Sequence, residues 1–394
     1  IADCNSTWES QGPLVRKIKW TPVGCPKGVK MSTIKIMALG GVRENGKNLY
    51  VAEVNEHIFV LDAGAKYPEN EQLGVDIVVP NFEYLEENKH RVAGIFLSHG
   101  HADAIGALPY LLEKVKVPVF GSHLTIELVK LLVKNNNATK KFNDFHVINE
   151  KTEIDFGDSV VSFFQTTHSI PESLGVVIKT DQGNIVYTGD FKFDQAADKF
   201  YKTDFSRLAE IGNEGVLALL SDSANADSNE QGASMHEARE EILNTIADWD
   251  GRIIVAAVAS NIVRIQQIFD AAEKTGRRIV LTGHDVENIV RTAIQLKKLH
   301  LVSEKLLVKP KDIAKYEDHE LIILETGRMG EPLNGLRKMA IGRHRYVEIK
   351  DGDLVYIVTT PSISKEAVVA RVENLVYKAG GVVQSIAKKL RVSG

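Results

Sequence analysis

The stretch S-H-G-H-A-D-A-I-G-A-L, residues 98–108, is the most informative segment of this 394-residue chain. It follows directly on R-V-A-G-I-F-L (91–97), an apolar run typical of a buried β-strand. Within it, His99 and His101 alternate with a glycine, and Asp103 comes two places later. Imidazoles and a carboxylate placed this closely at a strand exit indicate a metal-binding loop, because the strand fixes the ligands in position.

Two further candidate ligands stand at the ends of other predicted strands. The run E-I-D-F-G-D-S-V-V-S-F-F-Q-T-T-H ends in His168, and G-V-V-I-K-T-D-Q-G-N-I-V-Y-T-G-D ends in Asp190. A lone strand-end histidine is more often a structural residue, and an aspartate in T-G-D-F more often caps a turn. Together with His99, His101 and Asp103, however, the pair favours a metal site. Three imidazoles and a carboxylate suit zinc or manganese, and Asp190 could bridge two ions.

The chain changes its strand pattern midway. From Ile34 it reads as short β-rich runs separated by turns, which predict antiparallel hairpins. After about Asn225, a strand at R-I-I-V-A-A-V (252–258) is followed by a helical pattern and a second strand at R-R-I-V-L-T-G (277–283). This β-α-β order predicts parallel pairing, so a second unit with a different architecture begins in the middle of the chain.

Composition restricts the classes of partner and compartment. Hydrophobic residues make up 44% and charged residues 25% of the chain, ordinary values for a globular protein. The net charge of −4 gives no overall basic signature, so an anionic partner must be held by a local patch or by metal ions. No apolar run is long enough for a membrane span, and no secretory signal pattern opens the chain. Both cysteines, Cys4 and Cys25, precede Met31, which favours a cytoplasmic protein.

Several motifs together resemble one known family. S-H-G-H-A-D-A is similar to the histidine-x-histidine-x-aspartate-histidine signature of metallo-β-lactamase-fold hydrolases. Further segments resemble the ribonuclease J family, the bacterial β-CASP ribonucleases: G-K-N (46–48), F-V-L-D-A-G (59–64), L-G-V-D (73–76), T-T-H-S-I-P-E-S (166–173), Y-T-G-D-F-K-F-D (187–194), L-L-S-D-S-A-N (219–225), A-S-N-I-V-R-I-Q-Q-I (259–268) and G-E-P (330–332). The resemblance covers essentially the whole chain from Ile34 to Gly394.

This resemblance implies an α/β fold, a metallo-β-lactamase αββα sandwich with an inserted β-CASP domain of mainly parallel sheet. We therefore expect the first part of the metallo-β-lactamase domain over 31–225 and the β-CASP domain over 226–350. The returning part of the metallo-β-lactamase domain is expected over 351–394, with the C-terminal region of the family absent. We interpret residues 1–30 as a vector-derived extension ahead of an initiator Met31, rather than as a natural extension with its own partner.

The resemblance also assigns roles to the candidate ligands. A complete first metal site would be formed by four side chains: His99, His101, His168 and Asp190. Asp103 and the bridging Asp190 would serve a second site and act as the catalytic carboxylates. That second site lacks two histidines of the family, because Ala104 replaces one and the other belongs to a valine-histidine-glycine-glutamate loop beyond the position of Gly394. We expect one firmly held Zn²⁺ or Mn²⁺ and an impaired second site. Asp62 is expected to brace the histidine loop by hydrogen bonds.

On the phosphate side, the resemblance assigns Ser221, Asp222 and Ser223 to contacts with RNA. The histidine-alanine-serine motif of the family should follow directly on R-V-S-G (391–394). Its glycine-serine-glutamine-glycine-glutamate loop corresponds here to G-R-M-G-E (327–331). The phosphate pocket is therefore expected to differ from that of the family.

Two hypotheses of function follow. Two-metal phosphodiester hydrolysis needs both ions, so the resemblance implies a weak, metal-dependent exo- or endoribonuclease acting in RNA processing and decay. The chain resembles the second paralogue of bacteria with two ribonucleases J, which associates with its fully active partner. The implied substrate is 5′-monophosphorylated RNA, and the implied assembly is this hetero-oligomer or a homodimer.

The alternative is a non-catalytic RNA-binding and assembly subunit of a ribonuclease complex. A small-molecule hydrolase of the same fold, such as a thioesterase or a lactamase, is disfavoured because such enzymes lack the inserted β-α-β layer.

Overall fold

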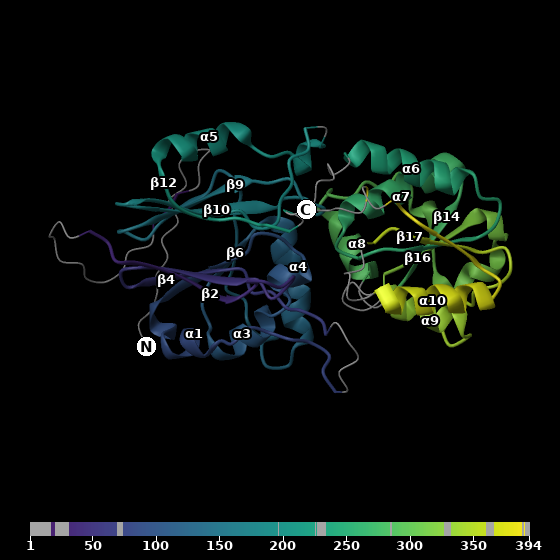
Figure 1. The fold of residues 1–394 in the computed structure, drawn as a ribbon, viewed down its shortest axis with the longest axis horizontal. Helices are drawn as coiled ribbons and strands as arrows, with labels where there is room; N and C mark the ends of the chain where they lie inside the picture. Colours follow the sequence, from purple (N-terminus) through teal and green to yellow (C-terminus); the bar gives the residue numbers. More distant parts are fainter. Residues whose placement is uncertain are drawn as a thin grey trace.

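The computed structural model describes residues 17–19, 31–68, 74–195, 197–224, 226, 234–283, 286–326, 332–359, 366–387 and 390. They form two lobes (Figure 1): the first lobe holds the described residues up to 224, and the second lobe holds those from 234 onward. Five motifs singled out in the sequence lie wholly or partly outside the described residues: L-G-V-D (73–76), L-L-S-D-S-A-N (219–225), G-R-M-G-E (327–331), G-E-P (330–332) and R-V-S-G (391–394).

The first lobe contains two six-stranded sheets. One sheet is antiparallel from β2 to β4 and parallel from β4 to β7. Its strands are, in spatial order, β2 (Ile34–Gly40), β3 (Leu49–Val54), β4 (His57–Leu61), β5 (Val92–Phe96), β6 (Val119–Gly121) and β7 (Phe145–Val147).

The other sheet of the first lobe is antiparallel from β8 to β11, which confirms the predicted hairpins in this part of the chain. Its strands are, in spatial order, β1 (Lys17–Lys19), β8 (Glu153–Asp155), β9 (Val160–Gln165), β10 (Leu174–Thr180), β11 (Gly183–Tyr187) and β12 (Val216–Leu220). Strand β1, which pairs in parallel with β8, lies within the segment interpreted as a vector-derived extension.

The two sheets stack face to face between outer helices (Figure 1), which is the αββα sandwich that the resemblance implied. Alternating residues of both sheets point inward, and Phe59, Phe96 and Phe163 are fully buried between them. Burial of this apolar surface is the main force that holds the layers together. Helix α5 (Phe205–Glu214) covers the β9–β12 side (Figure 1). The helices of the other side are α1 (Glu83–Glu87), α2 (Ala102–Ile105), α3 (Leu108–Lys114) and α4 (His123–Asn135), and the short 3-10 helices are η1 (Lys89–Arg91) and η2 (Lys199–Tyr201).

The second lobe is built on one six-stranded sheet in which every pairing is parallel, as the β-α-β pattern predicts. The spatial order is β15 (Leu307–Val308), β14 (Arg278–Thr282), β16 (Leu321–Glu325), β13 (Ile253–Ala256), β17 (Leu354–Ile357) and β18 (Val382–Ser385). Both faces of a parallel sheet must be covered, and helices lie on both (Figure 1). They are α6 (Met235–Ala247), α7 (Ile262–Thr275), α8 (Val286–Gln295), α9 (Pro332–Ala340) and α10 (Glu366–Lys378), with short 3-10 helices η3 (Glu304–Leu306), η4 (Pro310–Lys315) and η5 (Asp318–Glu320).

The expected return of the chain to the first lobe over 351–394 is wrong for the described residues of that range. Strand β17 pairs with β13, and β18 pairs with β17, so both strands complete the second sheet. Within G-D-L-V-Y-I-V-T-T (352–360), the strand Leu354–Ile357 has no polar alternation because it is buried on both faces. That pattern marks a central strand without indicating which sheet it joins.

The lobes meet beside the carboxyl end of β13. Helix α4 of the first lobe contacts α8 of the second, and the Val263 backbone N–H donates to the Ser169 carbonyl across the junction, at 3.2 Å. This junction places the start of α7 next to the loop that follows β9. None of the helices in the described part of the chain combines the length and the apolarity needed to span a bilayer.

Candidate metal centre

His99 and His101 lie in the turn between β5 and α2, where the sequence predicts a metal-binding loop. His101 is extended and stands as the residue before α2, while His99 is almost fully buried. The loop is held by the strand that precedes it and by α2, whose Ala102 and Ala104 carbonyls accept backbone hydrogen bonds from Ala65 and Ala63. The two imidazoles are therefore presented on a rigid frame.

His168 and Asp190 arrive from the opposite sheet, at the ends of β9 and β11. The turn before Asp190 comes very close to the histidine loop. Gly189 has a φ of +58°, and a Cβ on it would lie 2.7 Å from the Ser98 Cβ, so only glycine fits between the two segments. The two sheets thereby bring residues almost a hundred positions apart to one point.

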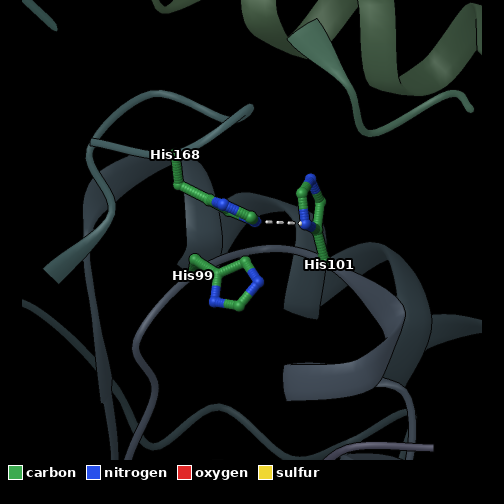
Figure 2. A group of neighbouring side chains, drawn as sticks. All are labelled: His99, His101 and His168. Atoms are coloured by element: carbon green, nitrogen blue, oxygen red, sulfur yellow. Dashed lines mark hydrogen bonds between the residues drawn. The ribbon is translucent and has the colours of Figure 1, made fainter. Parts of the chain in front are cut away.

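Three imidazoles form the centre of the site. Figure 2 shows His99, His101 and His168 turned toward one another, with ring centroids 4.7–4.8 Å apart. One ligand atom of each ring lies within 4.8 Å of the others, and His168 Nε2 lies 2.9 Å from His101 Nδ1. Two nitrogens bound to one tetrahedral zinc ion would be about 3.3 Å apart, so the spacing fits a shared ion.

A second group shares His99 with two carboxylates. Asp103 Oδ1 and Asp190 Oδ2 lie 3.7 and 3.9 Å from His99 Nε2, and their ligand atoms also fall within 4.8 Å of one another. Asp190 is thus grouped with His99 and Asp103, and not with His101 and His168 as the predicted first site had it. Burial and the nearby charges of Asp103 and Asp222 raise the pKa of Asp190 well above its ordinary value, and a bound cation would offset these effects.

Several properties of the site fit a divalent cation. His99 Nε2 and Asp103 Oδ1 are buried and have no hydrogen-bond partner, although buried polar atoms are normally satisfied. Burial, reinforced by the neighbouring His101, lowers the pKa of His99 well below its usual range. Burial also lowers the pKa of His101, against the opposing effect of Asp103. Neutral imidazoles beside carboxylates are the protonation states that metal ligation requires.

Asp62 braces the histidine loop, as predicted. Its carboxylate is fully buried and accepts hydrogen bonds from the Ser98 N–H at 2.7 Å, the Ser98 Oγ at 2.7 Å and the Tyr187 hydroxyl at 2.6 Å. Ser98 Oγ also lies 2.8 Å from His99 Nδ1, so the carboxylate orients this imidazole through the serine. Burial raises the pKa of Asp62 to about 7, although the hydrogen bonds favour its charged form.

The predicted phosphate-side residues follow β12. The Asp222 N–H donates to Thr188 Oγ1 at 3.0 Å, which brings Asp222 to the turn that carries Asp190. Ser221 and Ser223 are exposed, and neither makes a hydrogen bond to the histidines or to Asp103 and Asp190. The structure therefore places Asp222 in the electrostatic surroundings of the ligands and leaves the two serines at the surface.

Ala104 lies in α2, directly after Asp103. It is fully buried and belongs to the apolar cluster that packs the helices of the first lobe. A methyl group here fills core space and offers no ligand atom, so the second group has a single imidazole, that of His99.

Some residues of the site escaped the sequence prediction. Tyr187 donates to Asp62, Ser169 Oγ lies 3.3 Å from His101 Nε2, and the Ser260 backbone of the second lobe raises the pKa of His101, against the effect of burial. The first two are neighbours in sequence of Asp190 and His168, which was a usable signal. The third reaches the site only through the packing of the lobes, and no local pattern could indicate it.

Comparison with protein families gives two matches along the chain. Residues 42–231 match the family model of the metallo-beta-lactamase superfamily. Residues 250–376 match the model described as ribonuclease J, beta-CASP domain. The second range extends into the region that contains α10, in agreement with the place of β17 in the second lobe.

Among curated proteins, the chain is similar to several called ribonuclease J 2. It is 71% identical over 364 residues to Ribonuclease J 2 of Streptococcus pyogenes serotype M3, covering 92% of this chain and 66% of the relative. It is 43% identical over 361 residues to Ribonuclease J2 of Bacillus subtilis strain 168, covering 92% of this chain and 65% of the relative. The chain thus spans about two thirds of the length of these relatives.

Among solved structures, a protein of unknown function from Enterococcus faecalis V583 superposes with a TM-score of 0.64. The two chains are 14% identical, and the match covers 90% of this chain and 88% of the other. At this identity the likeness concerns the fold alone.

Proposed function

The chain belongs to the ribonuclease J family, and from this premise we propose that it is a weak, metal-dependent ribonuclease that hydrolyses RNA phosphodiesters. The observation that carries the proposal is the position of His99. Its imidazole belongs both to the three-histidine group and to the group with Asp103 and Asp190. We propose the three-histidine group as the main part of a firmly occupied site, and Asp103 with Asp190 as the ligands of a weaker one.

The residues have distinct roles in this proposal. His99, His101 and His168 hold the ion as neutral ligands, and Ser98 with Asp62 keeps the His99 ring in orientation. Asp190 and Asp103 provide the catalytic carboxylates at the open side of the site, where their side chains keep 26% and 25% of their surface exposed. A divalent ion such as Zn²⁺ or Mn²⁺ would supply Lewis-acid activation of water and of the phosphodiester. Ser221, Asp222 and Ser223 are proposed to face the RNA phosphates.

Weak activity follows from the ligand count of the second group. Two-metal hydrolysis needs both ions, and Ala104 provides no imidazole beside Asp103. A carboxylate pair with one histidine should bind its ion loosely, because that histidine is shared with the three-histidine group and Ala104 adds no further ligand atom. We therefore propose one firm ion per chain and a second that binds only when the ion is abundant.

Substrate, partner and compartment are proposed by analogy with the relatives. We propose 5′-monophosphorylated RNA as substrate, action in RNA processing and decay, and association with a fully active ribonuclease J paralogue, or with a second copy of the chain, in the cytoplasm. We also propose residues 31–225 as the metallo-β-lactamase domain and the β-CASP domain from residue 226 onward.

One observation supports a second candidate function. Since the position after Asp103 is occupied by a buried alanine, the site could have lost turnover while the lobes still bind RNA. The protein would then be a non-catalytic RNA-binding and assembly subunit of a ribonuclease complex.

Turnover of 5′-monophosphorylated RNA by the full-length protein in Mn²⁺ tests the proposal. We expect slow cleavage that a chelator abolishes and that the His99→Ala variant lacks, while the His90→Ala variant, altered at an exposed histidine, cleaves like the parent. Intact RNA binding with no cleavage at any Mn²⁺ concentration would instead favour the assembly subunit.

A further inference from the structure

Glu172 stands at the junction of the lobes, in the same loop as His168. It is a non-glycine residue with a φ of +63°, a left-handed conformation that persists only where the surroundings hold it. We infer that Glu172 is a positioning residue: its carboxylate joins the His168 loop to Lys298 of the second lobe and fixes how that lobe covers the metal centre. The joining of the lobes is inferred from geometry alone. The effect on catalysis rests, in addition, on the proposed function.

Within the first lobe, the carboxylate of Glu172 accepts a backbone hydrogen bond. Its Oε2 accepts the Leu124 N–H at 3.0 Å, in the first turn of α4, where a backbone donor has no partner within the helix. Its own N–H donates to the Phe200 carbonyl at 3.3 Å. The start of α4 therefore holds the side chain of Glu172, and the Phe200 carbonyl holds its backbone in the left-handed conformation.

On the second-lobe side, Lys298 completes the contact. Its Nζ lies 2.8 Å from Glu172 Oε1 and 4.3 Å above the centroid of the Phe200 ring. Lys298 follows α8, and its N–H is fixed by the Ala293 carbonyl of that helix. One ammonium thus contacts a carboxylate and an aromatic face, both from the first lobe.

This ion pair differs from the solvated pairs of the surface. The Lys298 side chain is 14% exposed and that of Glu172 is 24% exposed, whereas the surface pair of Lys114 and Glu86 is about half exposed on both sides. Exposed pairs contribute little to stability, but a pair withdrawn from water is screened less and restricts geometry more.

The loop connects this contact to the metal centre over a few residues. Ser169 touches His101 through its hydroxyl and receives the Val263 N–H through its carbonyl, and Ile170 is buried in the core. A change in the angle between the lobes would therefore pull on the segment that carries His168. Glu172 and Lys298 form the charged anchor of this segment, at the opposite end from the histidine.

The test measures the distance between the lobes by pulsed electron spin resonance. Spin labels are attached to Lys116→Cys and Lys274→Cys, one on each lobe at exposed positions, in the full chain with Cys4 and Cys25 replaced by serine. Lys298→Met keeps the aliphatic stem over Phe200 and removes the charge, and Glu172→Gln keeps an oxygen for the Leu124 N–H. Lys298→Arg retains the cation, and Lys297→Met alters an adjacent exposed lysine that has no ion pair among the described residues.

We expect the width of the distance distribution to about double in Lys298→Met and in Glu172→Gln, because domains joined by small interfaces move unless something restrains them. It should stay at the parent width in Lys298→Arg and Lys297→Met. Parent-like distributions in the first two variants, or broadening in Lys298→Arg, would overturn the inference.

A second measurement separates this result from the fate of the proposed function. Bound metal should be unchanged in Lys298→Met, while kcat/KM for RNA falls about tenfold because the covering lobe is misplaced. If the parent cleaves no RNA, the proposed function fails, and the distance distributions still decide whether the pair joins the lobes.

Discussion

The carboxyl ends of the strands differ sharply between the two lobes. In the first lobe, β5, β9 and β11 lead to histidines and aspartates whose atoms converge, and some of these atoms have no partner. In the second lobe, β14 ends at Thr282 and β16 at Glu325, and no comparable group of potential ligands occurs among its described residues. Strand ends therefore carry a group of potential metal ligands in the first lobe, and no such group occurs among the described residues of the second lobe.

Buried charges follow the same division. In the second lobe, the Arg252 guanidinium pairs with the Asp353 carboxylate through two hydrogen bonds, of 2.9 and 2.6 Å, and both side chains are buried. Among the described residues of the first lobe, Asp103 and Asp190 have no such cationic partner. A buried charge that is paired stabilises a fold, while carboxylates that lack a counter-charge form a site for a cation.

The largest effect is expected from breaking the pair of the second lobe. Asp353→Ala leaves Arg252 buried without its carboxylate and should lower the free energy of unfolding by about 3–5 kcal/mol. Unfolding is followed by the fluorescence of Trp249, whose indole donates to the Gly352 carbonyl, after Trp8 and Trp20 are replaced by phenylalanine.

The bound metal of the Asp353→Ala variant should equal that of the parent, because the ligands lie in the other lobe. The double variant Arg252→Met with Asp353→Ala is the control, and it should recover part of the lost stability. A loss of metal in parallel with the loss of stability would contradict the division between the lobes.

The His99→Ala variant tests the metal centre of the first lobe. Because His99 belongs to both groups, its removal should weaken ion binding by more than about 100-fold, beyond the 10- to 100-fold typical of residues that only orient ligands. Metal analysis after dialysis measures the loss, with His90→Ala as the matched control. Full retention of the ion would mean that it binds elsewhere.

A smaller loss is expected when the brace of the histidine loop is altered. Asp62→Asn places an amide group opposite Ser98 Oγ and the Tyr187 hydroxyl, which both donate to the carboxylate. We expect ion affinity to fall about 10- to 100-fold and stability to fall by about 1–3 kcal/mol. Titration of the ion and urea unfolding measure the two effects. Tyr187→Phe, which removes one donor, should show a lesser change in both, and an Asp62→Asn variant with parental affinity would exclude the bracing role.

The smallest expected effect is a gain in affinity for the second ion. Ala104→His offers an imidazole beside Asp103 and should tighten the second ion about tenfold. Because the methyl is fully buried, the ring must also displace core atoms, at about 1–3 kcal/mol of stability. Ala104→Leu carries a similar volume without a ligand atom and should lose stability without gaining affinity. Equal second-ion affinity in both variants would argue against a missing ligand at this position.

The chemistry of the site could be predicted because its signals are local. His99, His101, His168 and Asp190 each follow a strand, and strand ends converge at the edge of a sheet. That Asp103 and Asp190 share a group was predicted, but the grouping of Asp190 with His99 and not with His101 and His168 was not predictable, since it depends on how the two sheets stack.

The strand order of the second lobe was harder to predict from the sequence. An all-parallel sheet follows from the β-α-β pattern, but the place of 354–357 beside β13 is a long-range choice among buried strands of similar composition. The contact of Glu172 with Lys298 likewise joins residues of different lobes, and neither residue has a neighbour in sequence that indicates the other.

The most direct measurement is an anomalous diffraction map of the crystallised protein, recorded at the absorption edge of the ion that co-purifies with it. The strongest peak is predicted among the ring nitrogens of His99, His101 and His168, with a weaker peak beside Asp103 and Asp190 only when the crystal is soaked in excess ion. No peak among the three imidazoles, with the ion bound at another place on the molecule, would contradict the assignment of this cluster as the metal centre.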